Sequence, residues 1–249
     1  MVIQQDDGGA LCIGQASHAW LSGQLARAWG NERFGPVEPR EEVCLAAEQH
    51  DVGMAEWDVR PELNPETGLP RSFMEMDLDT HLRLWRSAPG RLVMQSRYAA
   101  LLVSMHGTAL YGMRDLDRME PGDAEKVRAF MRDTRSEQGR LAAGLDLDRV
   151  RRNQRLIWTW DFMSLALCLG WAPTTAEGVP AAGDLVDVEL TPAGERRVSF
   201  DPWPFSALGP VRVRCEGRRL TERFDDEGAM RAALHDAPVE VVEWELVQA

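Results

Sequence analysis

Apolar residues recur at helical spacing through the first two thirds of the chain. In one stretch, Ala99, Leu102, Val103 and His106 return every three or four residues, which places them on one face of a helix. The same periodicity predicts helices over residues 17–29, 41–52, 79–87, 92–110 and 149–171. Between the last two of these helices lies a charged segment, residues 115–144, and we expect it to be a solvated helix or hairpin that covers the core.

The pattern changes after Gly170, where a stretch rich in Pro, Gly and Ala leads into short alternating segments. These segments predict strands at 185–190, 197–200, 211–215, 218–223 and 239–247, with one helix at 227–235. The expected fold is therefore mainly α, a helical bundle with a small C-terminal antiparallel β appendage, or α+β overall. We expect a helical metal-binding domain at 1–172 and the β-rich appendage at 183–249.

Composition narrows the classes of partner. The chain has 249 residues and a net charge of −12, which repels phosphate backbones and argues against a nucleic acid polymer. No apolar run has the length of a membrane span, and the first nine residues do not have the pattern of a secretory signal. The four cysteines form no CxxC pair, so we expect reduced, mostly buried thiols. The sequence predicts a cytoplasmic protein.

Histidines and aspartates, which are both able to bind metals, follow one another along the predicted helices. Imidazole and carboxylate are the usual ligands of first-row metals, and five histidines in all are too few for this order to be surface decoration. The ordered residues are His18, His50, Asp51, His81, His106 and Asp161. This series predicts a metal site.

Asp161 and His50 carry the strongest local signals. Asp161 is the one acid or base in the apolar helical stretch over residues 157–171, and a buried carboxylate is costly unless it is paired or binds a cation. His50 shares a helical face with Val43, Ala46 and Ala47, so it should face inward, with Asp51 on the next edge at the helix end. His235 shows no inward pattern, and we interpret it as a surface residue.

A long irregular loop over residues 57–73 opens beside the His50–Asp51 pair. Long loops in compact domains are often functional, so a substrate-covering role is one interpretation and a plain surface excursion is the other. The candidate substrate contacts are Gln15, Trp57, Asn64 and Arg71. Asp58 is a candidate catalytic proton shuttle beside Asp51, although stabilising a turn would explain it as well.

The order His, His-Asp, His, His, Asp over residues 10–172 resembles the HD-domain metal-dependent superfamily, in its six-ligand dinuclear form. The chain as a whole is also similar to a bacterial family of uncharacterised HD-like proteins. The resemblance implies that one metal is held by His18, His50, Asp51 and Asp161. It implies that Asp51 bridges to a second metal, which is held by His81 and His106. The donor set favours iron first and manganese next.

The resemblance implies an enzyme that hydrolyses a small phosphate ester or nucleotide, with a small anionic molecule as substrate. Two alternatives stay open: a mixed-valence di-iron oxygenase acting on a polyol or phosphonate, and a non-catalytic module that binds metal or nucleotide. One departure is Met54, which stands where related sequences often carry a lysine three residues after the His-Asp pair. Arg71, Arg83 or Arg97 could supply the missing cation.

Overall fold

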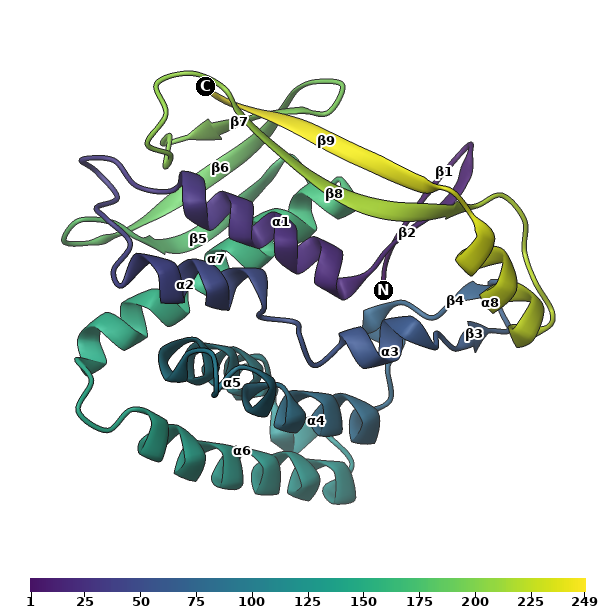
Figure 1. Ribbon diagram of the computed structural model, residues 1–249, viewed down its shortest axis with the longest axis horizontal. Helices are drawn as coiled ribbons and strands as arrows, with labels where there is room; N and C mark the ends of the chain where they lie inside the picture. The colour runs from purple at the N-terminus through teal and green to yellow at the C-terminus, as the bar shows by residue number, and fades with distance from the viewer.

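The computed structural model describes residues 1–249, and it stacks a large curved sheet on several layers of helix (Figure 1). The helices are α1 (Gln15–Ala28), α2 (Arg40–Glu48), α3 (Ala55–Val59), α4 (Leu78–Ser87), α5 (Arg97–Gly112), α6 (Pro121–Leu141), α7 (Leu147–Leu169) and α8 (Glu227–Asp236). The strands are β1 (Val2–Asp6), β2 (Gly9–Ile13), β3 (Leu63–Asn64), β4 (Leu69–Pro70), β5 (Thr174–Pro180), β6 (Leu185–Gly194), β7 (Arg197–Asp201), β8 (Val211–Leu220) and β9 (Val239–Gln248). Short 3-10 turns are η1 (Phe73–Glu75), η2 (Pro89–Arg91) and η3 (Leu116–Arg118).

Seven strands form one mixed sheet in the order β1-β2-β8-β9-β7-β6-β5. All neighbouring strands are antiparallel except β7 and β9, which run parallel. The strands β3 and β4 form a separate two-stranded hairpin. The helices α1 and α7 lie directly under the large sheet, α2 and α5 lie beyond them, and α6 forms the far edge (Figure 1).

The prediction of a mainly α fold with a small C-terminal β appendage was wrong, and so was the expectation of an all-α core. The sheet is a principal layer of the molecule, and it contains strands from both ends of the chain. The register of β2 against β8 runs from Ala10 opposite Leu220 to Ile13 opposite Gly217. The N-terminal hairpin therefore belongs to the same sheet as the C-terminal strands.

The N-terminal strands escaped prediction although β1 and β2 pair with each other, because the hairpin is short and the strand that joins it to the large sheet, β8, lies about two hundred residues away in the sequence. Leu11 and Ile13 of β2 are completely buried in the folded chain. Strand β5 was missed for another reason, since its Gly178 and Pro180 are typical of a linker. The prediction of two strands at 211–215 and 218–223 was also inexact, because β8 is continuous over residues 211–220.

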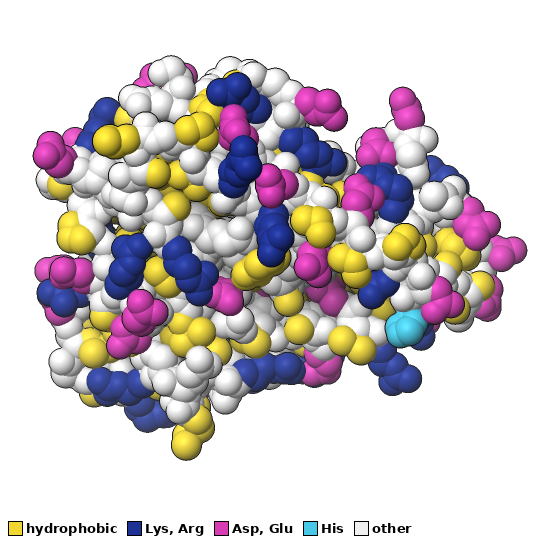
Figure 2. All heavy atoms as spheres, turned by 45° about the horizontal axis from the view of Figure 1, so that its top comes forward, with side chains coloured by type: hydrophobic (Ala, Val, Ile, Leu, Met, Phe, Trp, Pro, Cys, Tyr) yellow, Lys and Arg dark blue, Asp and Glu magenta, His cyan; other side chains and the backbone are white.

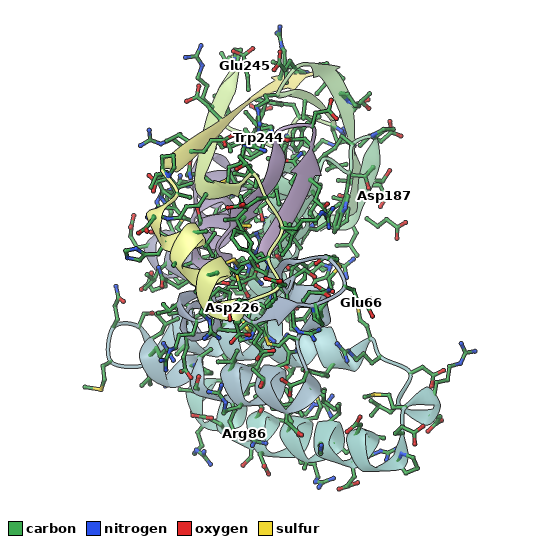
Figure 3. The ribbon with its side chains drawn as sticks, turned by 90° about the vertical axis from the view of Figure 1, so that its right-hand side faces the viewer. Glu66, Arg86, Asp187, Asp226, Trp244 and Glu245 are labelled. Atoms are coloured by element: carbon green, nitrogen blue, oxygen red, sulfur yellow. The ribbon has the colours of Figure 1, made fainter.

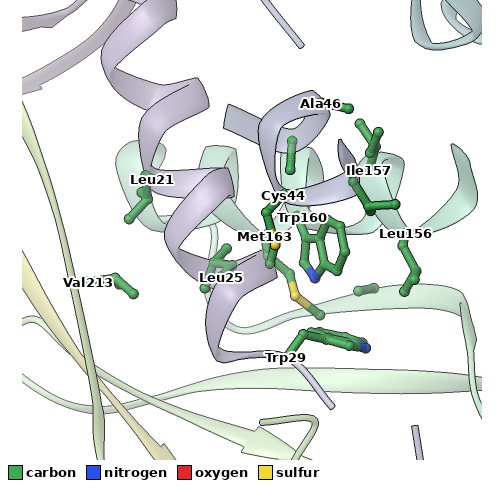
Figure 4. Packing of buried hydrophobic residues seen from close by; sticks show 14 of the residues in the cluster. Leu21, Leu25, Trp29, Cys44, Ala46, Leu156, Ile157, Trp160, Met163 and Val213 are labelled. Atoms are coloured by element: carbon green, nitrogen blue, oxygen red, sulfur yellow. The ribbon is translucent and has the colours of Figure 1, made fainter. Parts of the chain in front are cut away.

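Aliphatic side chains and two large tryptophans pack together in the main hydrophobic core (Figure 4). Trp29 and Trp160 are fully buried, and their rings meet edge to face with 5.6 Å between centroids. Trp29 makes a second edge-to-face contact with Phe205, at 5.8 Å. Each buried tryptophan removes about 150 to 250 Å² from water, so this contact anchors α1 and α7 to one another. All four cysteines are free and buried.

The helix α7 is capped at both of its ends. The side chain of Asp146 accepts hydrogen bonds from the backbone N–H groups of Asp148 and Arg149, which caps the first turn. The helix ends at Gly170, whose φ of +66° is the left-handed conformation that favours glycine. Between these caps α7 carries Asp161 into the middle of the helical layers.

The sheet and the outer helices lie at opposite ends of the molecule (Figure 3). Trp244 and Glu245 on β9 lie at the sheet end, and Arg86 on α4 lies at the opposite, helical end. On the face in Figure 2, positive and negative side chains are interspersed, without a large patch of one sign. None of the helices combines the length and the apolar character needed to cross a membrane.

The pairing of β2 with β8 can be tested at Gly9. This residue has a φ of +117°, and an added Cβ would lie 2.2 Å from the carbonyl oxygen of Leu220. We expect Gly9→Ala to lower the free energy of unfolding by ~1–3 kcal/mol, because both the backbone conformation and the strand contact resist a side chain. Urea denaturation measures this change.

Gly139→Ala is the matched control. Gly139 lies in α6 with no atom near the position of an added Cβ, so we expect a gain of ~0.5–1 kcal/mol from the better helix former. Equal stabilities for the two variants would contradict the close approach of β2 to β8.

Candidate metal centre

Five of the six predicted ligand residues converge between α1, α2, α5 and α7. His18 lies in the first turn of α1, and His50 and Asp51 lie in the turn that follows α2. His106 lies on α5 and Asp161 in the middle of α7. All five side chains are buried. The helical periodicity of the sequence had indicated these inward positions for His50 and His106.

The two carboxylates lie within contact distance of the imidazoles. The two Asp161 oxygens take separate partners: Oδ1 is 3.4 Å from His18 Nε2 and 3.3 Å from His50 Nε2, and Oδ2 is 3.4 Å from His106 Nε2. Asp51 Oδ2 is 3.1 Å from His18 Nε2 and 3.5 Å from His50 Nε2. Two groups, His18–His50–Asp51 and His50–His106–Asp161, each place three donor atoms within 4.8 Å of one another.

Hydrogen bonds orient two of the imidazoles. His50 Nδ1 lies 2.8 Å from the carbonyl oxygen of Ala47, which can only accept, so Nδ1 carries the hydrogen. His18 Nδ1 lies 2.8 Å from the hydroxyl of Ser164, which itself donates to the Asp161 carbonyl. His18 Nδ1 is therefore also the donor. In both rings Nε2 points into the site, as a metal ligand requires.

The facing nitrogens need a positive charge between or on them. His18 Nε2 and His50 Nε2 are 3.2 Å apart, and in the neutral rings two lone pairs would face each other. Burial by itself would lower the pKa of His50, but the carboxylates of Asp51 and Asp161 outweigh burial and raise it to about 9. Burial would raise the pKa of Asp161, yet hydrogen bonds from His106 and His50 hold it well below its usual range. Without a metal, a proton on His50 supplies the charge.

The donor set fits a divalent transition metal. Three imidazole nitrogens and two carboxylates suit iron, manganese or zinc, whereas magnesium and calcium prefer oxygen ligands alone. A cation among these atoms would take the place of the proton and satisfy both facing lone pairs. The residues that could hold it are His18, His50, Asp51, His106 and Asp161.

His81, the sixth predicted ligand, has other partners. The indole N–H of Trp85 donates to His81 Nε2 at 2.9 Å, and His81 Nδ1 lies 2.5 Å from the Tyr111 hydroxyl. Burial, with a contribution from the nearby Arg114 charge, lowers the pKa of His81 to about 4, so the ring is neutral at pH 7. Neither group of metal-type donors includes His81. His81 therefore lies outside both groups, with its two ring nitrogens in contact with Trp85 and Tyr111.

Comparison with known proteins identifies the family and leaves the activity open. A sequence model of the family described as "Protein of unknown function (DUF3891)" matches residues 1–222. The chain belongs to this family. The match includes the strands β1 to β8 and all six predicted ligands. No curated protein and no solved structure matches the chain. Nothing in the match links the DUF3891 family to the HD-domain superfamily, so that resemblance stays a prediction.

A cavity of about 350 Å³ opens over the metal-type residues of this DUF3891 chain. Its wall includes His18, His106 and Asp161, together with His81 and Arg114. Much of the remaining wall is apolar and includes Met54, Phe73, Met74 and Met76. A small molecule could therefore reach the buried carboxylates and imidazoles from this side.

Arg114 is the one cationic side chain on the cavity wall, and the sequence analysis missed it. The three arginines considered there are engaged elsewhere: Arg71 lies 3.7 Å from Glu62, Arg83 donates to Glu56, and Arg97 donates to a backbone carbonyl. Arg114 follows His106 by eight residues, just past the end of α5. Eight residues are a little over two helical turns, so the spacing from His106 was the sequence signal that could have identified Arg114.

Of the predicted substrate contacts, only Gln15 lines the cavity. Its side chain is buried and its Oε1 has no hydrogen-bond partner. Trp57 is instead buried in a cluster with Met54 and Trp85. Asn64 is buried at the end of β3, where its Oδ1 accepts from the N–H of Glu66.

Asp58, the predicted proton shuttle, lies outside the cavity. Its Oδ1 is 3.2 Å from the amino group of Met1, and its Oδ2 accepts the backbone N–H of Gln15 at the start of α1. Burial raises the pKa of Asp58 despite the nearby positive charge. The geometry assigns Asp58 to the start of α1, so of the two predicted catalytic acids only Asp51 lies at the centre.

The charge balance of the centre predicts a pH dependence of stability. The folded pKa of His50, about 9, exceeds the ordinary value of 6.5, so its contribution is complete below pH 6.5 and is lost as the pH rises through 9. We therefore expect the melting temperature of the metal-free chain to fall between pH 7 and pH 10. Scanning calorimetry of chelator-treated protein measures the change.

His50→Gln is the comparison variant, because it removes the titrating group and should flatten this part of the profile. An unchanged profile in the variant would contradict the role of His50. A melting temperature of the metal-free wild type that stays constant to pH 10 would do the same.

Proposed function

We propose that this chain is a metal-dependent enzyme that binds one divalent transition metal and hydrolyses a small phosphorylated substrate. The observation that carries the proposal is the 3.2 Å approach of His18 Nε2 to His50 Nε2, with both Nδ1 atoms already acting as donors. Such an arrangement calls for a cation. The cavity over these atoms gives a substrate access to them.

We propose one metal in place of the two that the family resemblance implies. His18, His50, Asp51, His106 and Asp161 form two groups of three donor atoms that share His50, and we place the one metal where these groups meet. A second ion would need His81, whose two ring nitrogens already contact Trp85 and Tyr111. Iron is the first candidate and manganese the second, because three imidazoles favour them over magnesium.

A bound divalent metal supplies a Lewis acid that lowers the pKa of water for attack on a phosphate ester. The chain's own residues prepare the cavity. Arg114 presents a guanidinium group, which suits the oxygens of a phosphate. Gln15 offers a buried carbonyl oxygen without a partner, which can accept a hydrogen bond from a substrate hydroxyl. The methionines of the wall exclude water around the reacting group.

Hydrolysis is our proposal in preference to oxygenation. The oxygenase alternative uses two irons, and the contacts of His81 favour one metal. A non-catalytic binding module is less favoured because the cavity brings a cation, Arg114, next to the metal-type residues. We further propose a cytoplasmic enzyme whose partner is a small anionic molecule and neither a nucleic acid polymer nor a membrane.

Metal stoichiometry tests the single site. We expect one metal per chain by plasma mass spectrometry on protein purified without chelator. His106→Ala should lower the metal content at least tenfold, because it removes one of the proposed metal ligands. His81→Ala should leave the metal content unchanged. Circular dichroism spectra of both variants establish that they are folded.

Two metals per chain in the wild type, with one lost in His81→Ala, would contradict this prediction and restore the dinuclear arrangement. A folded wild type that takes up no metal would overturn the proposed function itself.

Activity can be tested by phosphate release. We expect the iron- or manganese-loaded chain to release phosphate from at least one member of a panel of small phosphate esters. Asp51→Ala should reduce this rate by more than a hundredfold together with the metal content. His235→Ala is the matched control, because its imidazole is 87% exposed and should change neither quantity. Release that survives in Asp51→Ala would come from another site.

A further inference from the structure

A second hollow, of about 320 Å³, lies between the end of α5 and one face of α6. It is lined by eight residues, and four of them are arginines: Arg114, Arg128, Arg132 and Arg135. We call this hollow the arginine groove. No aspartate or glutamate lines it, although the whole chain carries a net charge of −12.

The arginine groove begins where the metal cavity ends. Arg114 lines both hollows. The ring of Tyr111 lines the groove, while its hydroxyl contacts His81 in the cavity wall at 2.5 Å. The Arg114 guanidinium lies over this ring, 4.8 Å from its centroid. Arg114 and Tyr111 therefore lie at the boundary between the two hollows.

The spacing of residues on α6 produces the groove. Arg128 and Arg132 are four residues apart, as are Met131 and Arg135, and this spacing places all four on one helical face. The adjacent face of α6 carries Val127 and Phe130 into the core. Helix α6 thus packs one face into the core and lines the arginine groove with the other.

The arginines of the groove are weakly neutralised. Arg114 and Arg135 have no carboxylate within 4.0 Å. Arg128 lies 3.8 Å from Asp117, which is 95% exposed, and Arg132 lies 3.0 Å from Glu125, which is 61% exposed. Such exposed pairs are weak, so an anionic ligand can compete for these side chains.

Another arginine-rich hollow of the molecule shows the contrast. A wide hollow near the start of α7 also contains four arginines, but Glu38, Asp148 and Asp184 line it with them. Its Arg152 and Arg155 donate to backbone carbonyls. Those arginines serve the fold, whereas the arginine groove keeps an excess of positive charge.

We propose that the arginine groove binds a second anionic group of the substrate, whose reacting phosphoryl group lies in the metal cavity. This inference rests on the proposed function and narrows it to substrates with two separated anionic groups, such as a bisphosphate. Guanidinium groups bind phosphate oxygens through paired hydrogen bonds. Leu116 and Met131 on the groove wall offer apolar contact to the part that links the two groups.

Non-hydrolysable bisphosphonates of different lengths test the distance between the two proposed anion sites. Titration calorimetry on the metal-loaded chain compares methylphosphonate with α,ω-alkane bisphosphonates of two to six carbons. We expect one chain length to bind at least tenfold more tightly than methylphosphonate, because the second group is held at a high effective concentration. The double variant Arg132→Gln/Arg135→Gln should lose this tenfold gain.

The matched control is Arg149→Gln/Arg151→Gln, which removes two exposed arginines from the mixed-charge hollow and changes net charge equally. It should keep the gain. An equal loss in both double variants would indicate long-range charge alone and overturn the groove. Affinity that depends on the arginines but not on chain length would assign the groove to a free anion and overturn the substrate assignment.

Two further results separate the groove from the metal site. If the chain takes up no metal, the proposed function fails, but bisphosphonate binding to the metal-free chain must still weaken in the groove variant and not in the control. If the groove variant lowers the melting temperature without changing any affinity, the arginines only stabilise the fold, and the proposal is wrong.

Discussion

The burial of Asp161 among three imidazoles is the constraint on which the centre of this molecule depends. A carboxylate inside a helical layer is costly unless positive charge faces it. His18, His50 and His106 provide the nitrogens, and a proton or a metal provides the charge. Because these residues come from different helices, the cluster fixes how α1, α5 and α7 meet the turn after α2.

The sheet gives this cluster a rigid support. Strand β8 contacts α1, and β5 contacts α7, so the two helices that carry His18 and Asp161 are held from one side. The edge-to-face packing of Trp29 on Trp160 joins the same two helices within the core. A metal site gains precision when its ligands lie on elements that cannot move independently. The N-terminal hairpin and the C-terminal strands contribute to the centre in this way without containing a ligand.

The two hollows divide the chemistry that we propose. The metal cavity holds the donor atoms and one cation, Arg114, and the arginine groove holds three more. Tyr111 links them, since its hydroxyl contacts His81 and its ring contacts Arg114. Tyr111 thus connects His81, in the wall of the metal cavity, to Arg114, whereas the family resemblance implies that His81 is a ligand of a second metal.

The sequence by itself indicated the buried histidines and acids that converge at the centre, with the exception of His81. Helical periodicity placed His50 and His106 inward, and the isolated acid Asp161 indicated a cation, because the cost of burying a charge can be recognised locally. Only the tertiary structure decided the rest. The seven-stranded sheet depends on β2 meeting β8 across about two hundred residues, and no local pattern encodes such a pairing. The contacts of His81, the position of Arg114 in the cavity and the place of Asp58 outside it likewise depend on which side chains other elements bring near, because a hydrogen bond or a cavity wall belongs to the packed molecule and not to a segment of the chain.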